Sequence, residues 1–586
     1  MSGFGFGPAL TAAGTTFRLW APAAKSVELV GDRAARMQPR PDGWHTLEVA
    51  DARAGTRYKF RIDGELEVAD PASAFQPDDV TGPSEVVDHA AYQWHTADWR
   101  GRPWQEAVIL ELHVGTFTPE GTFRAAIDRL DHVVDAGFTA IELMPVADFA
   151  GRRNWGYDGV LLYAPDSAYG RPDDLRALID AAHARGLMVL LDVVYNHFGP
   201  EGNYLGRYAP AFFEKGSTPW GQAIDYRVPQ VRAFAIENAL HWLDRYRFDG
   251  LRLDAIQAIV ERGEPSVLAE LSGAAGALAA RTGRMIHLVV ENDDNSASLL
   301  DALTAQPAGK FRAQWNDDYH HAWHVVLTGE THGYYSDHAA TPLGRIARVF
   351  GAGFDYQGER SPYRGGRKRG ERSGELSPIA FINFLQNHDQ VGNRALGDRI
   401  DALAAAPAIE AALAVTLLAP MPPMLFMGEE WGARTPFPFF CDFHGGLAEA
   451  VRKGRRAEFK DAYARYGDAI PDPLDPATFR AAALDWREPQ GESARKRLAL
   501  VRDLLRVRRE KVVPLLAALR FDPHATRARA ALLRAEWTHP QARLRLLANL
   551  SGEAKPRPAD WKNGAPIWGG EPGANLPPWS VFWSIT

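Results

Sequence analysis

Two charged side chains lie close together in an otherwise apolar stretch of the chain. Arg252 and Asp254 are two positions apart in FDGLRLDAIQAI, residues 248–259. In a β-strand, side chains at this spacing leave on the same face, so both would point into whatever that face encloses. Burying even a paired charge costs several kcal/mol before the attraction offsets it. The pair is therefore either a structural ion pair or the floor of a site.

Similar groups end three other apolar segments. These groups are the side chains of Asp192, Asn196, His197, Glu291, His388 and Asp389. A carboxylate at the end of a single strand is more often a solvated cap than a catalyst. Carboxylates with Arg and His partners on four strands are hard to explain by capping and favour one shared acidic mouth. In that mouth, Arg252 would keep Asp254 ionised by charge pairing.

The elements that must position these groups follow a regular order. Short apolar runs predict strands at 108–114, 139–145, 188–196, 249–255, 285–292, 311–317, 381–389 and 423–430. Helical patterns lie between several of them, at 123–137, 173–186, 231–247 and 407–418. The class is therefore α/β, and eight strands with intervening helices predict a closed (β/α)8 TIM barrel. In such a barrel, groups at the carboxyl ends of different strands meet at one face.

The two ends of the chain have a different pattern. The first hundred residues alternate short β-prone runs with turns, which predicts an N-terminal β-sandwich. After a last helix at 502–516, β-prone runs return and predict a C-terminal β-sandwich. We therefore expect domains at 1–98, 99–518 and 519–586, with the barrel in the middle and long loops after its third, sixth and eighth strands.

Composition excludes several classes of protein. The chain has 586 residues, 46% of them hydrophobic and 24% charged, which is ordinary for a globular protein. The net charge is -7 with both signs interspersed, so no nucleic-acid partner is expected. The dense basic run Arg364–Arg372 is short, and we interpret it as a solvated loop.

Other sequence features point to a cytoplasmic protein without a membrane partner. The longest apolar stretch, 411–428, is interrupted by prolines and predicts a helix, a break and a buried strand. The first residues, MSGFGFGPAL, do not resemble a secretory signal. Cys441 is the only cysteine, so no intrachain disulfide can form, and we expect it to be a small packing residue.

Converging carboxylates without a nucleophilic cysteine indicate chemistry on a glycosidic bond. In that reaction one carboxylate attacks while another protonates the leaving oxygen. A zinc site is the competing interpretation, because His320 and His324 are four positions apart and could share a helix face. No CxxC and no obvious third ligand accompany them. We expect no metal and no cofactor.

Four short motifs resemble those of the α-amylase superfamily, glycoside hydrolase family 13. They are DVVYNH (192–197), GLRLDA (250–255), VVEN (289–292) and FLQNHD (384–389), in the expected order. The resemblance implies that Asp254 is the nucleophile, Glu291 the general acid/base, and Asp389 a third carboxylate that grips sugar hydroxyls. It also implies a substrate-binding set that comprises Tyr157, Asp192, His197, Arg252, Gln257 and His388. Asn196 stands where many α-amylases bind calcium, and the sequence leaves calcium open.

Longer stretches resemble the maltooligosyltrehalose trehalohydrolase family within that superfamily. The segment 17–31 is similar to the carbohydrate-binding-like sandwich before the barrel, and 111–123, 142–160, 314–330, 427–432 and 436–440 carry the further likeness. Members release trehalose from a maltooligosyl chain that a separate synthase has capped, so maltooligosyltrehalose is the implied substrate. Relatives often carry histidine at the place of Gln257, so altered affinity is expected. The polar run after Glu291, which comprises Asn292, Asp293, Asp294 and Asn295, is a candidate for holding the trehalose unit.

The expected reaction is a retaining, two-step hydrolysis of the α-1,4 bond next to the terminal trehalose. Retention predicts that Asp254 and Glu291 are roughly 5–5.5 Å apart. Two alternatives remain open at this point. One is a branching or debranching enzyme on the same scaffold, and the other is a noncatalytic glucan-binding protein. Oligomeric state and preferred chain length are not predicted.

Overall fold

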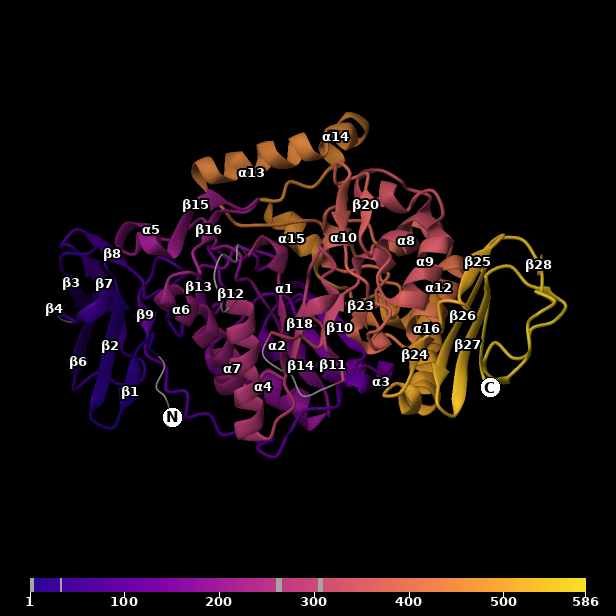
Figure 1. The fold of residues 1–586 in the computed structure, drawn as a ribbon. Coiled ribbons are helices and arrows are strands. Elements are labelled where there is room, and N and C mark those ends of the chain that lie inside the picture. The colour runs from indigo at the N-terminus through magenta and orange to yellow at the C-terminus, as the bar shows by residue number, and fades with distance from the viewer. Residues whose placement is uncertain (1–4, 32–33, 260–265, 304–308) are drawn as a thin grey trace.

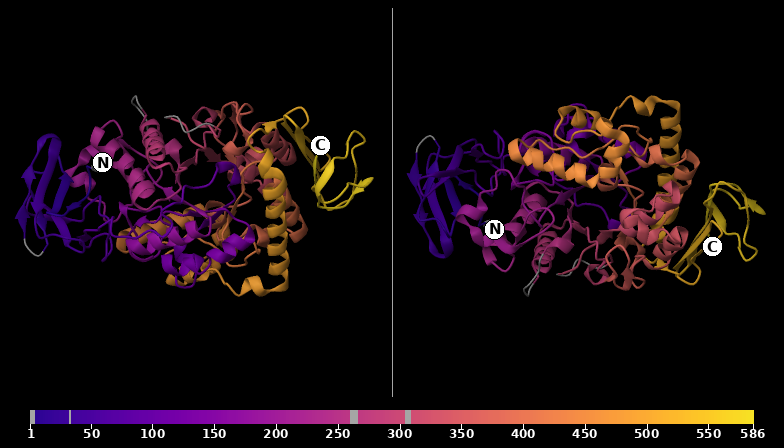
Figure 2. Two further views of the ribbon diagram at one scale, coloured as in Figure 1. Left: turned by 90° about the horizontal axis from the view of Figure 1, so that it is seen from below. Right: turned by 90° about the horizontal axis from the view of Figure 1, so that it is seen from above.

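The molecule is elongated, with β-rich parts at both ends of a central barrel (Figures 1 and 2). The structure is a computed structural model that describes all residues except 1–4, 32–33, 260–265 and 304–308. The N-terminal sheets lie at one end and the C-terminal sheet at the other. The predicted domain boundaries at 98/99 and 518/519 stay a proposal, and each falls between strands of different sheets.

Eight parallel strands of the described residues form one sheet, as predicted. They are β10 (Ile109–Leu112), β11 (Ala140–Leu143), β14 (Met188–Val193), β17 (Gly250–Leu253), β18 (His287–Val290), β19 (Ala313–Trp315), β22 (Phe381–Ile382) and β23 (Met424–Phe426). Every residue of these strands is buried, which explains their nearly unbroken apolar runs. A parallel bridge between Asn383 and Pro423 joins the ends of the sheet and closes the barrel.

The seventh strand is shorter than predicted. It ends at Ile382, and His388 and Asp389 belong instead to helix α10 (His388–Gly392). The side chain of Asn387 caps this helix by accepting hydrogen bonds from the backbone N–H groups of Asp389 and Gln390. The extended reading of 381–389 was therefore wrong in its second half, because an N-cap residue stood inside the motif.

Helices surround the barrel largely where the sequence predicts them. The main ones are α4 (Pro172–Ala184), α6 (Pro229–Leu240), α7 (Val267–Thr282), α12 (Ala406–Leu418) and α16 (Glu492–Val507). The helix predicted at 123–137 is two helices, α2 (Phe123–Ile127) and α3 (Leu130–Ala136), and the second ends at Gly137 as expected. The helix predicted at 231–247 changes to a π-helical turn after Leu240.

The N-terminal part is a pair of antiparallel sheets, as predicted. One sheet contains β1 (Ala9–Thr11), β2 (Gly14–Trp20), β5 (Gln38–Pro39) and β6 (Trp44–Val49). The other contains β3 (Val27–Val30), β4 (Ala35–Arg36), β7 (Arg57–Ile62), β8 (Leu66–Val68) and β9 (Ser84–Glu85). Burial alternates along β7, so one face of each strand packs in the core.

The C-terminal part is a six-stranded antiparallel sheet with a small second layer. The sheet contains β24 (Arg520–Phe521), β25 (Arg527–Arg529), β26 (Leu532–His539), β27 (Ala542–Asn549), β29 (Ala565–Trp568) and β31 (Ser580–Ile585), and the second layer is β28 (Lys555–Pro556) with β30 (Asn575–Leu576). The indole of Trp583 donates to the carbonyl of Ala414 at 3.1 Å. This bond fastens the sheet to helix α12 of the barrel.

Long loops follow strands β14, β19 and β23, as predicted. They contain the elements α5 (Leu205–Tyr208), β15 (Phe213–Ser217), β16 (Gln222–Ile224), α8 (Asp317–Thr328), α9 (Pro342–Ala352), β20 (Glu359–Ser361), β21 (Arg367–Arg369), α13 (Gly445–Glu458), α14 (Lys460–Tyr466) and α15 (Pro476–Ala482). Helix α11 (Ile400–Leu403) lies between β22 and β23. Shorter connections hold α1 (Val114–Phe117), β12 (Ala147–Asp148) and β13 (Leu161–Pro165). Figure 1 shows α13, β15, β16 and β20 on one side of the barrel.

The stretch 411–428 has the predicted form. Helix α12 ends at Leu418, and β23 follows after the prolines. Within the described part of the chain, no helix is both long and apolar enough to cross a membrane.

Candidate active site

A cavity of about 630 Å³ opens at the carboxyl ends of the barrel strands. Most of the predicted site residues line it: Tyr157, His197, Asp254, Gln257, Glu291, His388 and Asp389. Asp192 and Arg252 do not line it but contact residues that do. The structure therefore brings the whole predicted set together from five barrel strands, β11, β14, β17, β18 and β22, and the connections that follow them.

Arg252 lies beneath the cavity and binds three carboxylates. Its Nη1 donates to Asp254 at 2.8 Å and to Asp192 at 2.7 Å, and its Nη2 donates to Glu291 at 2.8 Å. The guanidinium packs over the indole of Trp315, 4.0 Å from the ring centroid. Arg252 is only 1% exposed, so these interactions act in a poorly screened environment. Arg252 and Asp254 therefore form an ion pair, and the same pair makes the floor of the cavity.

The backbone after β17 holds Asp254 and Glu291 together. Ala255 has a φ of +41°, which a non-glycine residue seldom adopts and which turns the chain sharply after Asp254. Its N–H donates to Glu291 Oε2 at 2.9 Å. On the other side, Asn196 Nδ2 donates to Asp254 Oδ2 at 2.8 Å. Both carboxylates are thus fixed by donors from neighbouring strands.

Burial governs the protonation of these two carboxyl groups. Desolvation raises the pKa of Asp254, although Arg252 and the Asn196 amide oppose the rise. Desolvation also raises the pKa of Glu291, and the nearby charge of Asp254 adds to that rise while Arg252 opposes it. Arg252 lowers the pKa of Asp254, as the sequence predicts, but burial raises that pKa by more.

His388 is held in its charged form from below. Its Nδ1 lies 2.5 Å from Glu111 Oε1, and its backbone N–H donates to Glu111 Oε2 at 3.1 Å. The charges of Glu111 and Asp389 raise the pKa of His388 to about 9, against the opposing effect of burial. Its Nε2 lies 3.6 Å from Asp389 Oδ1. An imidazolium therefore separates Glu111 from the third carboxylate of the cavity.

Tyr157 forms one wall of the same subsite. Its ring stacks on His388 with centroids 5.0 Å apart, and its hydroxyl donates to Asp192 at 2.6 Å. The Nε2 of His197 lies 3.0 Å from the carbonyl oxygen of Tyr157, and the ring of His197 stacks against Trp220 with centroids 5.9 Å apart. A flat aromatic face beside hydroxyl-binding groups suits a sugar ring.

A second buried carboxyl group lies under the cavity floor. Glu142 on β11 is directly opposite Glu111 on β10 in the sheet and is 1% exposed. Among the described residues, neither of its carboxyl oxygens has a hydrogen-bond partner. Desolvation and the charges of Asp192 and Glu111 raise its pKa well above the ordinary value. The surroundings of Glu142 therefore favour its neutral form.

The rim of the cavity includes residues that the sequence analysis missed. They are Trp220, Asp317, Tyr334, Tyr363, Arg364, Arg369 and Arg455. Asp317 follows an aromatic residue and an amide in QWNDD, a combination that could have signalled it. Desolvation and the charge of Glu291 raise its pKa to about 8. The others lie in long loops, where no periodic pattern marks them.

The interpretation of the basic run as a solvated loop was wrong for Arg364, which is partly buried and pairs with Asp293 and Asp294, and for Arg369. Arg367 and Lys368 are exposed as expected, but Arg369 is only 5% exposed and forms ion pairs with Asp318 and Asp293. The expectation for Cys441 is confirmed, because the thiol is buried and burial raises its pKa to about 12.

The histidines considered for zinc have other partners. His320 lies against the carbonyl of Leu385 and the hydroxyl of Tyr335, and His324 Nε2 lies 2.8 Å from Glu330. Both side chains of helix α8 are therefore engaged in contacts with protein groups.

Another set, Asp318, His321 and His338, has the spacing of a metal site. Both oxygens of Asp318 already accept hydrogen bonds, one of them from the Arg369 guanidinium. A cation at this carboxylate would have to displace another cation. The donor set therefore fits an ion pair better than a metal.

Comparison with known proteins agrees with the fold and the site. Residues 108–215 match the model of the α-amylase catalytic domain, and residues 4–73 match that of carbohydrate-binding module 48, the isoamylase N-terminal domain. A crystal structure of a putative alpha amylase from Salmonella typhimurium superimposes with a TM-score of 0.94 at 46% identity and covers 99% of both chains. A pullulanase from Paenibacillus barengoltzii, at 19% identity and a TM-score of 0.71, shares the fold.

Fold and carboxylates together define a glycoside hydrolase of the α-amylase superfamily. The chain is 43% identical to the malto-oligosyltrehalose trehalohydrolase of Deinococcus radiodurans, across 86% of this chain and 82% of that one. It is 44% identical to the enzyme of that name from Arthrobacter ramosus, across 84% and 87% of the two chains. A branching enzyme from Mycobacterium tuberculosis matches only 42% of the chain. The chain belongs to the malto-oligosyltrehalose trehalohydrolase family.

Proposed function

We propose that the enzyme hydrolyses the α-1,4 bond next to the terminal trehalose of maltooligosyltrehalose and releases trehalose and a maltooligosaccharide. The observation that carries the proposal is the Arg252 guanidinium shared by Asp254 and Glu291 at the floor of a sugar-sized cavity. The names of the relatives over most of the chain supply the substrate class. The partner that caps the substrate is proposed to be a separate synthase, and a cytoplasmic location remains a prediction from the sequence.

In the proposed mechanism, Asp254 is the nucleophile and Glu291 the general acid/base. Glu291 protonates the oxygen between glucan and trehalose while Asp254 attacks the anomeric carbon, giving a covalent glycosyl-enzyme. Glu291, now a base, takes a proton from water as the water attacks the same carbon, and the bond from that carbon to Asp254 breaks and frees the carboxylate. The configuration is retained, and the carboxylate separation of roughly 5–5.5 Å stays a prediction.

The surroundings of the two groups support these different roles. Asp254 accepts hydrogen bonds from Arg252 and Asn196, which stabilise its charge before attack. The charge of Asp254 raises the pKa of Glu291 and so favours the protonated acid. Once Asp254 is esterified, that charge is gone and Glu291 becomes a stronger acid, which suits its change to an ionised base for the second step.

The remaining predicted residues are proposed to bind the glucose at the cleavage point. Asp389 grips hydroxyl groups, with the charged His388 beside it, and Tyr157 stacks on the sugar face. Asp192 supports both Tyr157 and Arg252 from beneath through short hydrogen bonds. Gln257 faces the leaving-group side, where its side-chain oxygen accepts a hydrogen bond from the N–H of Asp293 at 3.3 Å.

Product analysis tests the proposal against a branching, debranching or noncatalytic protein. A trehalose-capped maltooligosaccharide and the uncapped oligosaccharide of equal length are incubated in parallel. Rapid release of free trehalose from the first, with slow attack on the second, is the expected result. Equal attack on both, accumulation of branched products, or no hydrolysis would each contradict the proposed specificity.

A further inference from the structure

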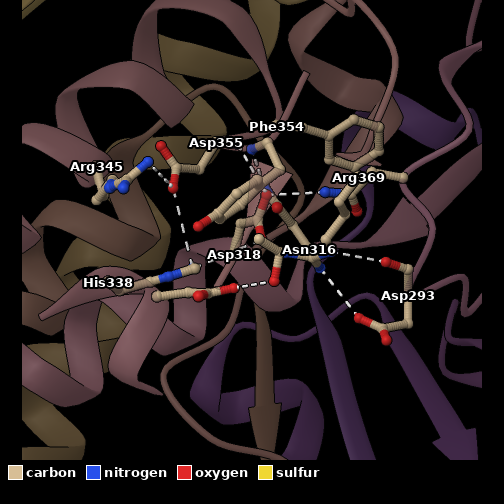
Figure 3. Close-up of polar contacts among 12 residues, drawn as sticks. Asp293, Asn316, Asp318, His338, Arg345, Phe354, Asp355 and Arg369 are labelled. Carbon is tan, nitrogen blue, oxygen red and sulfur yellow. Dashed lines mark hydrogen bonds and ion pairs between the residues drawn. The ribbon is translucent and has the colours of Figure 1, made fainter. Parts of the chain in front are cut away.

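Arg369 is the buried end of a hairpin that is otherwise exposed. It is the last residue of β21, whose other residues, Arg367 and Lys368, face solvent. Figure 3 shows the guanidinium of Arg369 between Asp318 on one side and Asp293 on the other. Asp318 belongs to helix α8 and Asp293 to the loop after the proposed acid Glu291. One cation thus joins two loops of the barrel mouth.

The Asp318 end of this connection is rigidly held. Asp318 is fully buried, and its Oδ2 accepts hydrogen bonds from Asn295 at 2.8 Å and from the backbone N–H groups of Asp355 at 2.9 Å and Tyr356 at 3.0 Å. Its Oδ1 accepts a hydrogen bond from Arg369 Nη1. A carboxylate with this many donors is a fixed anchor for the guanidinium.

The Asp293 end lies at the cavity. Arg369 Nε donates to the carbonyl oxygen of Asp293 at 2.7 Å, and its Nη2 lies 3.2 Å from Asp293 Oδ1. The Asp293 side chain is 50% exposed and lines the cavity, while its N–H donates to Gln257 on the leaving-group side. Arg364 also pairs with the Asp293 carboxylate and donates to its carbonyl oxygen at 2.8 Å. Two guanidinium groups therefore hold a residue that is open to a ligand, and Arg369 is the one that also binds Asp318.

The same hairpin fastens the residues that follow Asp293. Gly370 N–H donates to the carbonyl of Asp294 at 3.1 Å, and Glu371 N–H donates to that of Asn295 at 3.0 Å. Gly370 has a φ of +84°, and a Cβ there would stand 1.8 Å from the carbonyl oxygen of Tyr356. Only glycine allows the chain to pass at this point, directly after Arg369.

We propose that Arg369 is a positioning residue that, by tying Asp293 to Asp318, holds the Asp293 carboxylate where it binds the hydroxyls of the trehalose leaving group. This inference rests on the proposed function. Asp293 is the group that touches the sugar, and Arg369 acts through it. Without Arg369, Asp293 would keep its contact with Arg364 but lose its connection to the buried Asp318. Its carboxylate would then be less well oriented, and the enzyme would lose preference for the capped chain while keeping Asp254 and Glu291 intact.

The test compares R369Q and R369K with the matched control K368Q, which changes an exposed cation of the same strand. Steady-state kinetics on the capped and uncapped oligosaccharides give the ratio of the two kcat/KM values. R369Q is expected to lower that ratio about tenfold, the effect of one charge-assisted hydrogen bond, chiefly by raising KM for the capped chain. R369K is expected to recover part of the loss, and K368Q to match the wild type.

A double-mutant cycle with D293N checks that the effect passes through Asp293. R369Q added to D293N should lower the ratio no further. If the two substitutions lower the kcat/KM ratio independently, the inference is overturned. A normal ratio in R369Q and R369K would also overturn it, even if the melting temperature of these variants falls. If R369Q does not fold, R369K alone gives the ratio that decides. A wild type without preference for the capped chain would instead overturn the proposed function.

Discussion

Glu111 and His388 form a buried ion pair in which both carboxylate oxygens contact the same histidine residue. One oxygen meets the imidazole Nδ1 and the other accepts a hydrogen bond from the backbone N–H. Glu111 is therefore a support for both the charge and the position of His388. The two residues are 277 positions apart, on β10 and α10.

Replacing Glu111 with glutamine is expected to lower the pKa of His388 and remove a pH-dependent part of the stability. The folded pKa of about 9 lies above the ordinary value near 6.5. This contribution is therefore complete below about pH 6.5 and is lost as the pH rises to about 9. Melting temperatures from pH 6 to 10 should fall more steeply in the wild type than in E111Q.

The control for this experiment is E106Q, which removes a surface ion pair with Arg102 outside the site. It should leave the pH dependence of stability unchanged. An E111Q protein with the same pH dependence as the wild type would show that His388 does not depend on Glu111 for its charge.

Replacing Asp254 with asparagine is expected to lower turnover on the order of 10⁴-fold, because the amide cannot form the glycosyl ester. The shape of the cavity should persist, since Asn196 and Arg252 keep other partners. Kinetics, together with oligosaccharide binding followed by tryptophan fluorescence, measure the two effects separately. D503N on the exposed face of α16 is the matched control, and substantial residual turnover in D254N would refute its assignment as nucleophile.

The barrel and the groups at the carboxyl ends of its strands could be predicted from the sequence, because buried strands have a recognisable pattern of apolar residues. Strands covered on both faces need unbroken apolar runs, so a charged residue at the end of one stands out. Arg252, Asp254 and Glu291 were found in this way. The seventh strand was predicted too long because His388 and Asp389 follow an N-cap, and a cap and a strand end look alike in a short motif.

The support of the site could not be predicted because it joins distant loops. Arg369 lies among basic residues that are exposed, and only its ion pairs with Asp318 and Asp293 distinguish it from Lys368. Glu142 is one polar residue in an apolar strand, and its raised pKa follows from its burial and from the charges of Asp192 and Glu111 near it. Such pairings follow from tertiary structure rather than from periodicity.

Replacing Arg508 with methionine is expected to destabilise the fold without changing specificity. Arg508 is 1% exposed, and it donates to the carbonyls of Leu417 at 3.1 Å and Met421 at 2.8 Å, and to that of Ala419. Leu417 and Ala419 lie at the end of helix α12, where carbonyls lack intrahelical donors, and Met421 lies in the segment that follows it. Leaving these carbonyls unsatisfied should lower the free energy of unfolding by about 2–4 kcal/mol.

Thermal or urea unfolding of R508M measures the loss. R509M, which changes the exposed neighbouring arginine, should unfold like the wild type. Equal stability of R508M and the wild type would mean that the carbonyls find other donors. A changed product pattern would mean that the helix end also shapes the active site.

The pH dependence of activity should be a bell displaced upward from ordinary carboxyl values. The proposed mechanism needs Asp254 ionised and Glu291 protonated, and burial raises the pKa of both groups. The midpoint of the acidic limb should therefore lie above the ordinary aspartate pKa of about 3.9. The midpoint of the basic limb should lie above the ordinary glutamate pKa of about 4.3. The groups interact, so each limb reports the pair rather than one residue.

E291Q should separate the two limbs. On the natural substrate it should be nearly inactive, because the leaving oxygen receives no proton. On a glycosyl fluoride, whose leaving group needs none, E291Q should form the ester with Asp254, and mass spectrometry should detect it because no base activates water. Its rate of ester formation should keep the acidic limb and lose the basic one. A basic limb that persists in E291Q would assign that proton to another group, and Asp317, whose pKa burial and the charge of Glu291 raise to about 8, would be the next to replace.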